Sequence, residues 1–253
     1  PFILRRMKSE VLRELPPKTE NVRRVELETE QRKLYLAAVV DAREKLRAAK
    51  PEDKMTVFAV LMRLREICCD PRLVADNWTG SSAKLDACLE LVTEAVAGGH
   101  RILLFSQFTS MLELLAKRLD EAGVSHFTLQ GSTPKPVRAE QVRRFNQGEA
   151  DVFLISLRAG GTGLNLTAAD IVIHYDPWWN LAAQNQATDR AYRIGQRNPV
   201  QVYRLIAQDT IEEKIVELQQ AKQSLADTVT GGADGAILSM NPEQLLQLLG
   251  EEA

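Results

Sequence analysis

Residues 151–180 read "DVFLISLRAGGTGLNLTAADIVIHYDPWWN", and this stretch decides the fold class. It holds two short apolar runs, residues 152–156 and 171–175, with a glycine-rich loop between them. Short apolar runs bounded by turn residues are typical of strands that are buried on both faces. Such strands occur mainly in parallel sheets with helices on both sides.

The same alternation continues before and after this stretch. We expect further strands at residues 101–106, 126–129 and 200–207, and helices at residues 83–97, 108–121, 137–146, 181–194 and 211–225. Ser82 is expected to cap the first of these helices, and Gly98 and Gly99 to end it. Strands that alternate with helices predict an α/β fold with three layers and a mostly parallel central sheet.

A different pattern precedes residue 81. Apolar residues recur there at helical spacing in two segments, at Tyr35, Val39, Ala42 and Leu46 and at Val57, Leu61, Leu64 and Cys68. This spacing predicts two amphipathic helices, and residues 21–28 are expected to form a short strand. The sequence leaves open whether the two helices pack on the rest of the molecule or protrude toward a partner.

We expect three regions along the chain. Residues 1–80 would form a lead-in and a helical insertion, residues 81–227 the α/β lobe, and residues 228–253 a glycine-containing stretch followed by a short helix that Asn241 caps. The sequence starts at Pro1, without an initiator methionine and inside a pattern, so we expect a piece of a longer protein.

Composition excludes several classes of protein. The chain has 253 residues, of which 45% are hydrophobic and 26% charged, as in ordinary globular domains. No apolar run approaches the roughly 20 residues that cross a bilayer, and no signal peptide is present, so we expect an intracellular protein. Its three cysteines and three histidines are scattered, which argues against a metal site or a disulfide framework. A net charge of −2 means that binding to a polyanion would need a local patch.

Three loops follow strands of the expected sheet, and ligands of parallel sheets bind at the carboxyl ends of the strands. Hydroxyl and amide groups in two of these loops, and the bare backbone of the glycine loop, suit phosphate oxygens. We reject a dinucleotide-binding fingerprint, because Leu166 takes the place of its third glycine. The residues that we expect to contact a nucleic-acid backbone are Ser106, Gln107, Ser132, Thr133, Arg158, Gly160, Gly161 and Trp179. Trp178 is expected in the core, and His174 is expected to be a strand residue with a hydrogen-bond partner.

Four ordered motifs carry a resemblance to a known family. They are "RILLFSQFTSMLELL", "LQGSTPKPVRAEQVRRFN", "LISLRAGGTGLNLTAADIVIHYDPWWN" and "QATDRAYRIGQ". In this order they resemble the second RecA-like lobe of the Swi/Snf-type ATP-dependent DNA translocases, a branch of the superfamily-two helicases. The segment "FILRRMKSEVLRELPPKTE" resembles the link between the two lobes of that family. The chain departs from the family pattern at Gln130, Leu181 and Tyr192.

The resemblance implies a role for the last motif. Gln186, Arg190 and Arg193 are spaced by four and three residues, which places them on one face of the expected helix 181–194. In the family the two arginines reach the phosphates of ATP held by the first lobe, as catalytic arginine fingers. Gln186 would contact the nucleotide or couple it to the glycine loop, and Gly163 and Asn165 would lie at the seam between the lobes.

The sequence lacks the other half of such a catalytic site. It has no Gly-Lys-Ser/Thr phosphate loop, and "DEAG" at residues 120–123 ends an amphipathic helix instead of following a strand. We therefore expect ATP and Mg²⁺ to be held mainly by the first lobe, and the fragment alone to be inactive. The expected partners are double-stranded DNA, the first lobe of the same full-length chain and a nucleoprotein complex, with no membrane. The expected location is the cytoplasm and nucleoid of a bacterium, or the nucleus of a eukaryote.

Two other functions stay open. The chain could be the lobe of an RNA helicase, although the linking segment, the helical insertion and "DPWWN" favour the DNA-translocating branch. It could also be a catalytically silent module that binds nucleic acid or protein, although Arg190 and Arg193 argue against that.

Overall fold

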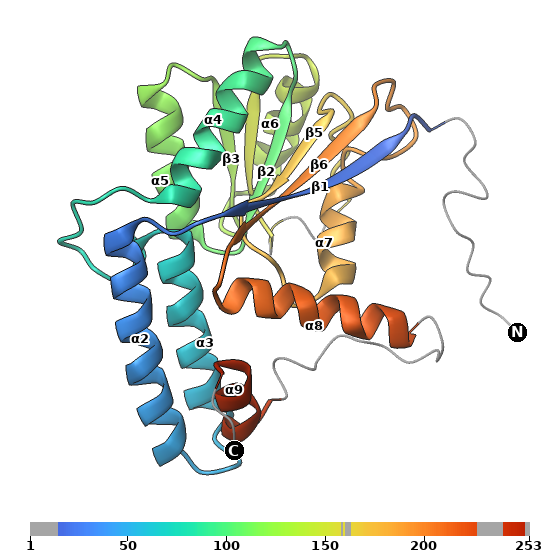
Figure 1. The fold of residues 1–253 in the computed structure, drawn as a ribbon. Coiled ribbons are helices and arrows are strands. Elements are labelled where there is room, and N and C mark those ends of the chain that lie inside the picture. The colour runs from blue at the N-terminus through green and yellow to red at the C-terminus, as the bar shows by residue number, and fades with distance from the viewer. Residues whose placement is uncertain (1–14, 158, 160–162, 227–239, 251–253) are drawn as a thin grey trace, which may run out of the picture.

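The computed structural model describes residues 15–157, 159, 163–226 and 240–250, apart from the side chains of residues 222–226 (Figure 1). Its centre is a six-stranded sheet with the order β1-β6-β5-β2-β4-β3, in which every pair of neighbours is parallel. The strands are β1 (Lys18–Val25), β2 (Ile102–Ser106), β3 (His126–Leu129), β4 (Val152–Ser156), β5 (Ile171–His174) and β6 (Val200–Ala207). The predicted parallel sheet is confirmed.

Helices cover both faces of the sheet. They are α4 (Ala83–Ala97), α5 (Thr109–Glu121), α6 (Lys135–Asn146) and α7 (Leu181–Thr188), whereas α8 (Ile211–Ala226) packs with the helices of the insertion. One core joins α4 and α5 to alternate residues of the central strands, such as Leu104 and Leu154. A second core joins Phe145 of α6 and Ala187 of α7 to residues on the opposite face, such as Phe105. The three predicted layers are therefore present, and strands β2, β4 and β5 are buried over their whole length.

The helical insertion packs on the lobe and also extends beyond the sheet (Figure 1). It consists of α2 (Thr29–Ala48) and α3 (Lys54–Cys69), followed by the short helix η1 (Pro71–Leu73). Their apolar stripes share a core with α8 and with α9 (Pro242–Leu248). The hydroxyl of Tyr35 on α2 accepts a 2.7 Å hydrogen bond from the backbone N–H of Ile211, which ties the insertion to the start of α8.

Strand β1 lies within the lead-in predicted at residues 1–80, yet it is part of the sheet. It pairs with β6 over its full length, from Lys18 opposite Val200 to Val25 opposite Ala207. The lead-in and the lobe therefore share a continuous hydrogen-bonded structure.

The predicted helix ends are confirmed in part. Asn241 caps α9 with a capping box, and Gly98 ends α4. Ser82 occupies the N-cap position of α4 but makes no capping bond, because its hydroxyl donates to the backbone oxygen of Cys69 at 3.1 Å. The helix predicted at residues 181–194 ends at Thr188, so the prediction is wrong for residues 189–194.

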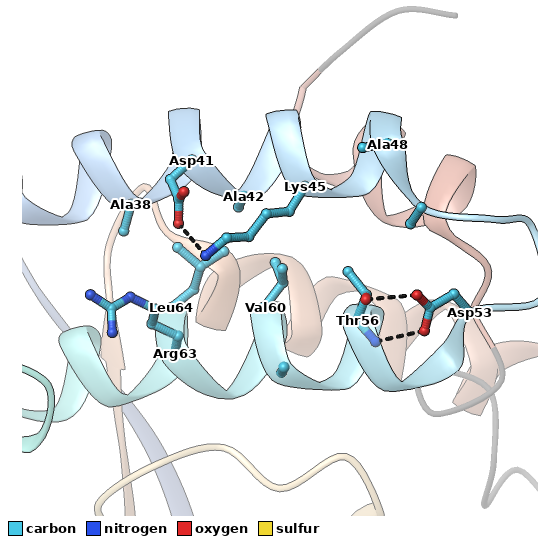
Figure 2. A pocket seen from close by; sticks show the side chains of 12 residues that line it. Ala38, Asp41, Ala42, Lys45, Ala48, Asp53, Thr56, Val60, Arg63 and Leu64 are labelled. Carbon is cyan, nitrogen blue, oxygen red and sulfur yellow. Dashed lines mark hydrogen bonds and ion pairs between the residues drawn. The ribbon is translucent and has the colours of Figure 1, made fainter.

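A groove with a volume of about 420 Å³ runs between α2 and α3 (Figure 2). Alanine side chains and an ion pair of 2.8 Å between Asp41 and Lys45 form part of its wall. At one end Asp53 caps α3 through bonds to the backbone and hydroxyl of Thr56. None of the residues predicted to bind nucleotide or nucleic acid lines this groove.

Candidate nucleotide and nucleic-acid interface

Four loops lie in a row at the carboxyl edge of the sheet. All strands are parallel, and β5, β2, β4 and β3 are successive neighbours, so the loops that follow them leave the same edge in that order. These loops contain "DPWWN", "SQFTS", the glycine stretch and "QGSTPK". The sheet order thus groups the loops in which the sequence predicts contacts with a polyphosphate backbone.

The loop after β3 presents a hydroxyl at the surface. Ser132 is exposed, whereas Thr133 is half-buried and uses its Oγ1 to accept a 3.0 Å bond from the N–H of Gln130. The N–H of Thr133 in turn donates to the oxygen of Gln130 at 3.1 Å. Thr133 therefore shapes the turn, and Ser132 is the side chain that faces solvent.

The loop after β2 is more buried than the sequence indicates. Ser106 has no exposed surface, and its hydroxyl donates to Oδ1 of Asp176 at 2.7 Å. Ser106 therefore has no exposed side-chain surface, and its hydroxyl instead bonds to the loop after β5. Gln107 is half-buried, and its Oε1 accepts a 2.8 Å bond from Arg65.

Both tryptophans of "DPWWN" are half-buried. The ring of Trp179 lies over the guanidinium of Arg65, with 3.9 Å between the ring centroid and Cζ, and it packs against the core of the insertion. The backbone of Trp178 is held at both ends, because its N–H donates to Gln184 at 3.2 Å and its oxygen accepts from Gln219. Trp179 is thus a packed ring at the edge of the sheet, with part of its surface exposed.

His174 matches its predicted place in a strand. Its Nε2 lies 2.9 Å from the hydroxyl of Thr188, and its ring stacks on Phe105. Burial, followed by the charge on Arg204, lowers the pKa of His174 from 6.5 to about 3. The imidazole is therefore neutral at physiological pH and serves as a buried hydrogen-bonding group.

The glycine loop lies partly outside the described residues. Arg158, Gly160 and Gly161 fall in that part, so their predicted contacts stay predictions. Gly163 is exposed with φ at +38°, a conformation that favours glycine. Asn165 is exposed, and its backbone oxygen accepts a 2.8 Å bond from Asn146.

The two arginines lie past the end of α7, on a series of turns. Here some backbone N–H groups donate to the oxygen three residues earlier, which makes a tighter turn than an α-helix. The N–H of Arg190 donates to the oxygen of Ala187, and that of Ala191 to the oxygen of Thr188, both at 3.1 Å. Gln186 remains on the helix and is exposed. Helical spacing therefore does not describe Arg190 and Arg193, although the two charges still interact.

Arg190 is nearly buried, with 6% of its surface exposed. Its Nε has no hydrogen-bond partner among the residues that the structure describes. Burial lowers the pKa of Arg190, and the nearby charge of Arg193 lowers it further, while Asp189 acts in the opposite direction. A guanidinium still stays charged at neutral pH, so this side chain is a cation held in an unfavourable environment.

The arginine segment is bonded directly to the stretch of chain that follows the glycine loop. Arg193 donates to the oxygen of Leu164 at 3.3 Å, and the N–H of Leu166 donates to the oxygen of Arg190 at 3.1 Å. Gln196, nearly buried, donates from Nε2 to the oxygens of Thr167, Ala169 and Ala191 at 3.3, 2.7 and 3.2 Å. These bonds connect the arginine segment to residues 164–169.

Sequence reasoning missed Arg65 and Asp176. Both side chains are completely buried, and they form an ion pair with 3.3 Å between Nη2 and Oδ2. The sequence does indicate that Arg65 is buried, because it lies in the apolar stripe of its helix, four residues after Leu61. Asp176 directly follows an apolar strand, which is where ligand-edge residues occur in parallel sheets.

Neither a membrane span nor a metal cluster is found in the part of the chain that the structure covers. No helix there is long and apolar enough to cross a membrane. No group of three or more His, Cys, Asp or Glu side chains in the same residues is arranged to hold a metal ion.

Comparison with known proteins identifies the class. The family described as helicase conserved C-terminal domain matches residues 83–195, and the SNF2-related domain family matches residues 1–73. An uncharacterized ATP-dependent helicase of Mycoplasma pneumoniae is 39% identical over 249 residues, which is 98% of this chain and 24% of that protein. The putative ATP-dependent helicase/translocase YwqA of Bacillus subtilis is 39% identical over 257 residues, 98% of this chain and 28% of that protein.

A solved structure agrees with these relatives. The Sulfolobus solfataricus SWI2/SNF2 ATPase core in complex with dsDNA aligns with 100% of this chain and 55% of that one, at 31% identity and a TM-score of 0.78. The fold and the matches define a helicase C-terminal domain with a RecA-like α/β fold. The chain belongs to the SWI2/SNF2-type ATP-dependent helicases, and it spans about a quarter of the length of the curated relatives it matches.

Proposed function

We propose that this chain is the second motor lobe of an ATP-driven translocase on double-stranded DNA. In this proposal it supplies Arg190 and Arg193 to a nucleotide held by a first lobe, and it grips the DNA backbone with the loops at the carboxyl edge of its sheet. The observation that carries the proposal is the nearly buried Arg190, whose Nε has no partner among the described residues and which lies near a second cation.

The carboxylate of Asp189 offsets the charge of this site only in part, because the pKa of Arg190 is still lowered. Burying a cation without full compensation costs free energy, and a nearby like charge adds to the cost. The oxygens of a transferring phosphoryl group would satisfy both guanidinium groups, and an arginine finger is worth about 10³ to 10⁵ in rate. Arg193 also bonds to the chain beside Gly163, so nucleotide binding would be felt there. Gln186, exposed one turn earlier, would make the remaining contact with the nucleotide.

The loops at the carboxyl edge of the sheet are suited to contacts with the phosphate backbone of DNA. Ser132 and the neighbouring Lys135 are exposed at the start of α6, and a helix N-terminus favours phosphate. Together with Gln107, Trp179 and the glycine loop, they would form a track that touches phosphates rather than base edges. Such contacts carry no sequence information, and this suits a motor that must pass over any sequence.

The site of catalysis would be completed outside this chain. The sequence has no phosphate-binding loop, and the described residues include no acidic cluster for Mg²⁺. ATP and Mg²⁺ would therefore be held by the first lobe, and this chain alone would not hydrolyse ATP. The names of the relatives support ATP dependence, and the Sulfolobus ATPase core, which was solved in complex with dsDNA, supports duplex DNA as the ligand.

The test is ATP turnover by the full-length protein with duplex DNA, single-stranded RNA or no nucleic acid. We expect stimulation by duplex DNA, and a loss of about 10³ in the Arg193→Ala variant. Arg197→Ala is the matched control, because Arg197 is an exposed arginine of the same segment. Stimulation by RNA alone would favour an RNA helicase, and full activity of Arg193→Ala would contradict the proposed role of that arginine.

A further inference from the structure

Arg65 is the largest of the completely buried side chains in the described part of the molecule. It belongs to α3 of the insertion, on the turn that lies against the carboxyl edge of the sheet. A guanidinium stays charged at any working pH, so its complete burial is costly unless fixed partners accept from its donors. Both Nη atoms of Arg65 have such partners, while its Nε has none among the described residues. The identity of those partners shows which parts of the molecule this side chain holds together.

The partners come from two different loops of the edge. Nη1 donates to Oε1 of Gln107 in the loop after β2, at 2.8 Å. Nη2 donates to Oδ2 of Asp176, at 3.3 Å, and to the backbone oxygen of Pro177, both in the loop after β5. One planar group therefore bridges two neighbouring loops of the row.

Two aromatic rings fix the plane of that group. The centroid of Trp179 lies 3.9 Å from Cζ of Arg65, and the centroid of Phe108 lies 5.6 Å from it. Cations stack favourably on aromatic faces, and the planar guanidinium does so better than an ammonium group. Trp179 and Gln107, which are two of the predicted DNA contacts, are thus both held by Arg65.

Asp176 extends the same connection to the backbone. Its Oδ1 accepts bonds from the Ser106 hydroxyl at 2.7 Å and from the N–H of Gln107 at 3.2 Å. Oγ of Ser106 then accepts a 3.2 Å bond from the N–H of Phe108. These bonds connect Ser106, Gln107 and Phe108, where β2 ends, to Asp176 in the loop after β5.

We propose that Arg65 is the positioning residue of the DNA-contacting edge: it holds Gln107 and Trp179 in place and makes the helical insertion and the two loops move as one body. This proposal rests on the proposed function, because it assigns a positioning group to the same edge. It adds a residue on a different element, outside the four loops, and gives the insertion a mechanical role.

Stability alone does not explain this arrangement. Buried ion pairs are often no more stabilising than apolar residues of the same volume. Burial raises the pKa of Asp176 even though the charge of Arg65 acts to lower it, so the pair compensates desolvation incompletely. An arginine fixes the orientation of its partners: Nη1 binds Oε1 of the Gln107 amide, and the buried Nε2 of Gln107 is left without a partner among the described residues.

The first measurement reads the position of Trp179 without DNA or ATP. In a Trp78→Phe/Trp178→Phe background, Trp179 is the remaining tryptophan of the chain, and acrylamide quenching reports its accessibility. We expect Arg65→Met to raise the quenching constant about twofold, because the ring loses the cation that holds it. Leu61→Ala is the matched control: it removes a buried side chain from the same helix and from the same apolar cluster, but it leaves the bonds of Arg65 to both loops in place.

The second measurement is the affinity of the chain for a labelled duplex, with native tryptophans and at fixed salt. We expect Arg65→Met to weaken binding about tenfold, equivalent to one or two displaced contacts, and Arg65→Lys to fall between it and the wild type. Leu61→Ala, compared at temperatures where both variants are folded, should bind within about twofold of the wild type.

The outcomes separate the two proposals. Failure of the wild-type chain and of the full-length protein to bind duplex DNA would remove the proposed function, while a raised quenching constant would still support the positioning role. An unchanged quenching constant in Arg65→Met would overturn the inference, as would equal loss of DNA affinity in Leu61→Ala. If Arg65→Met does not fold, Arg65→Met/Asp176→Asn replaces it, because a neutral pair leaves no unpaired buried charge.

Discussion

Two buried arginines of this molecule differ in how their charge is compensated. Arg65 has no exposed surface, but a carboxylate, an amide oxygen, a backbone oxygen and an aromatic ring surround it. Arg190 is almost as buried, and Arg193 and Asp189 act on its charge in opposite directions. Nε lacks a partner among the described residues in both arginines, so the difference lies in the rest of the surroundings. Both Nη atoms of Arg65 bind acceptors of its own domain, whereas Arg190 lies beside a like charge, as expected of a group that meets its anion in an assembled site.

The difference teaches how to separate structural cations from candidate catalytic ones. A cation paired with a buried carboxylate, as Arg65 is with Asp176, contributes to the geometry of its own domain, and removing that carboxylate should damage folding. A cation held near a like charge adds little to stability and can be retained for function. Variants of four residues test how far this distinction holds.

The largest expected effect is on catalysis by Arg190. In the full-length protein, Arg190→Ala should lower DNA-stimulated ATP turnover by about 10³, because one guanidinium would no longer reach the transferring phosphoryl group. Its free energy of unfolding should change by less than about 1 kcal/mol, because an incompletely paired cation is removed. Turnover assays and denaturant titration measure the two quantities. Severe destabilisation with normal turnover of the folded fraction would place Arg190 in the same class as Arg65.

The next effect is on folding at Asp176. Asp176→Asn leaves Arg65 buried without a counter-charge, and breaking a buried ion pair in this way costs about 3–5 kcal/mol. Urea titration of this chain measures the loss. The double variant Arg65→Met/Asp176→Asn serves as the control and should recover part of the stability; recovery of none would show that the charge pair itself is not the cause.

A smaller effect is expected at Gln196, which joins the arginine segment to residues 167–169. Gln196→Ala would leave three backbone oxygens short of a donor, at a cost of about 1–3 kcal/mol. Hydrogen exchange should show faster opening of residues 163–169, while the edge around Arg65 keeps its protection. Equal loss of protection in both regions would mean that they unfold as one unit.

The smallest effect concerns pH. The pKa of His174 is about 3 in the folded chain against an ordinary value of 6.5, so the unfolded state binds a proton that the folded state excludes. The stability contributed by the neutral ring is fully present above pH 6.5 and is lost as pH falls toward 3. Between pH 7 and pH 5 the loss is about 2 kcal/mol. His174→Gln, measured by urea titration at both pH values, should lose less stability than the wild type over that interval; an equal loss in both proteins would assign the acid sensitivity to other groups.

The sheet could be predicted from sequence because its signal is local. Runs such as residues 102–106 and 152–156 are apolar throughout, and parallel strands that helices cover on both sides need that composition. The boundaries of α7 could not be predicted, because the segment 189–193 keeps helix-compatible residues. Its tighter turns are held by bonds from Leu166 and Gln196, and Leu166 lies far from this segment in the sequence.

The candidate site was predictable as a set of loops but not in its details. Strand order placed the loops on one edge, while burial decided which side chains are available there. Ser106 and Ser132 are both serines near strand ends, and only the second reaches solvent. The difference depends on Asp176, which follows a strand seventy residues further along the chain and accepts the Ser106 hydroxyl. A pattern of residue types does not contain that information.

The pairing of β1 with β6 has a mechanical consequence. Eight residues of β1 run parallel to β6, with Lys18 opposite Val200 and Val25 opposite Ala207. Tension applied to the chain ahead of Lys18 acts along this ladder, so its hydrogen bonds carry the load in shear, all at once, instead of opening one after another. A force applied on the N-terminal side is therefore transmitted to the whole sheet through the full length of β1.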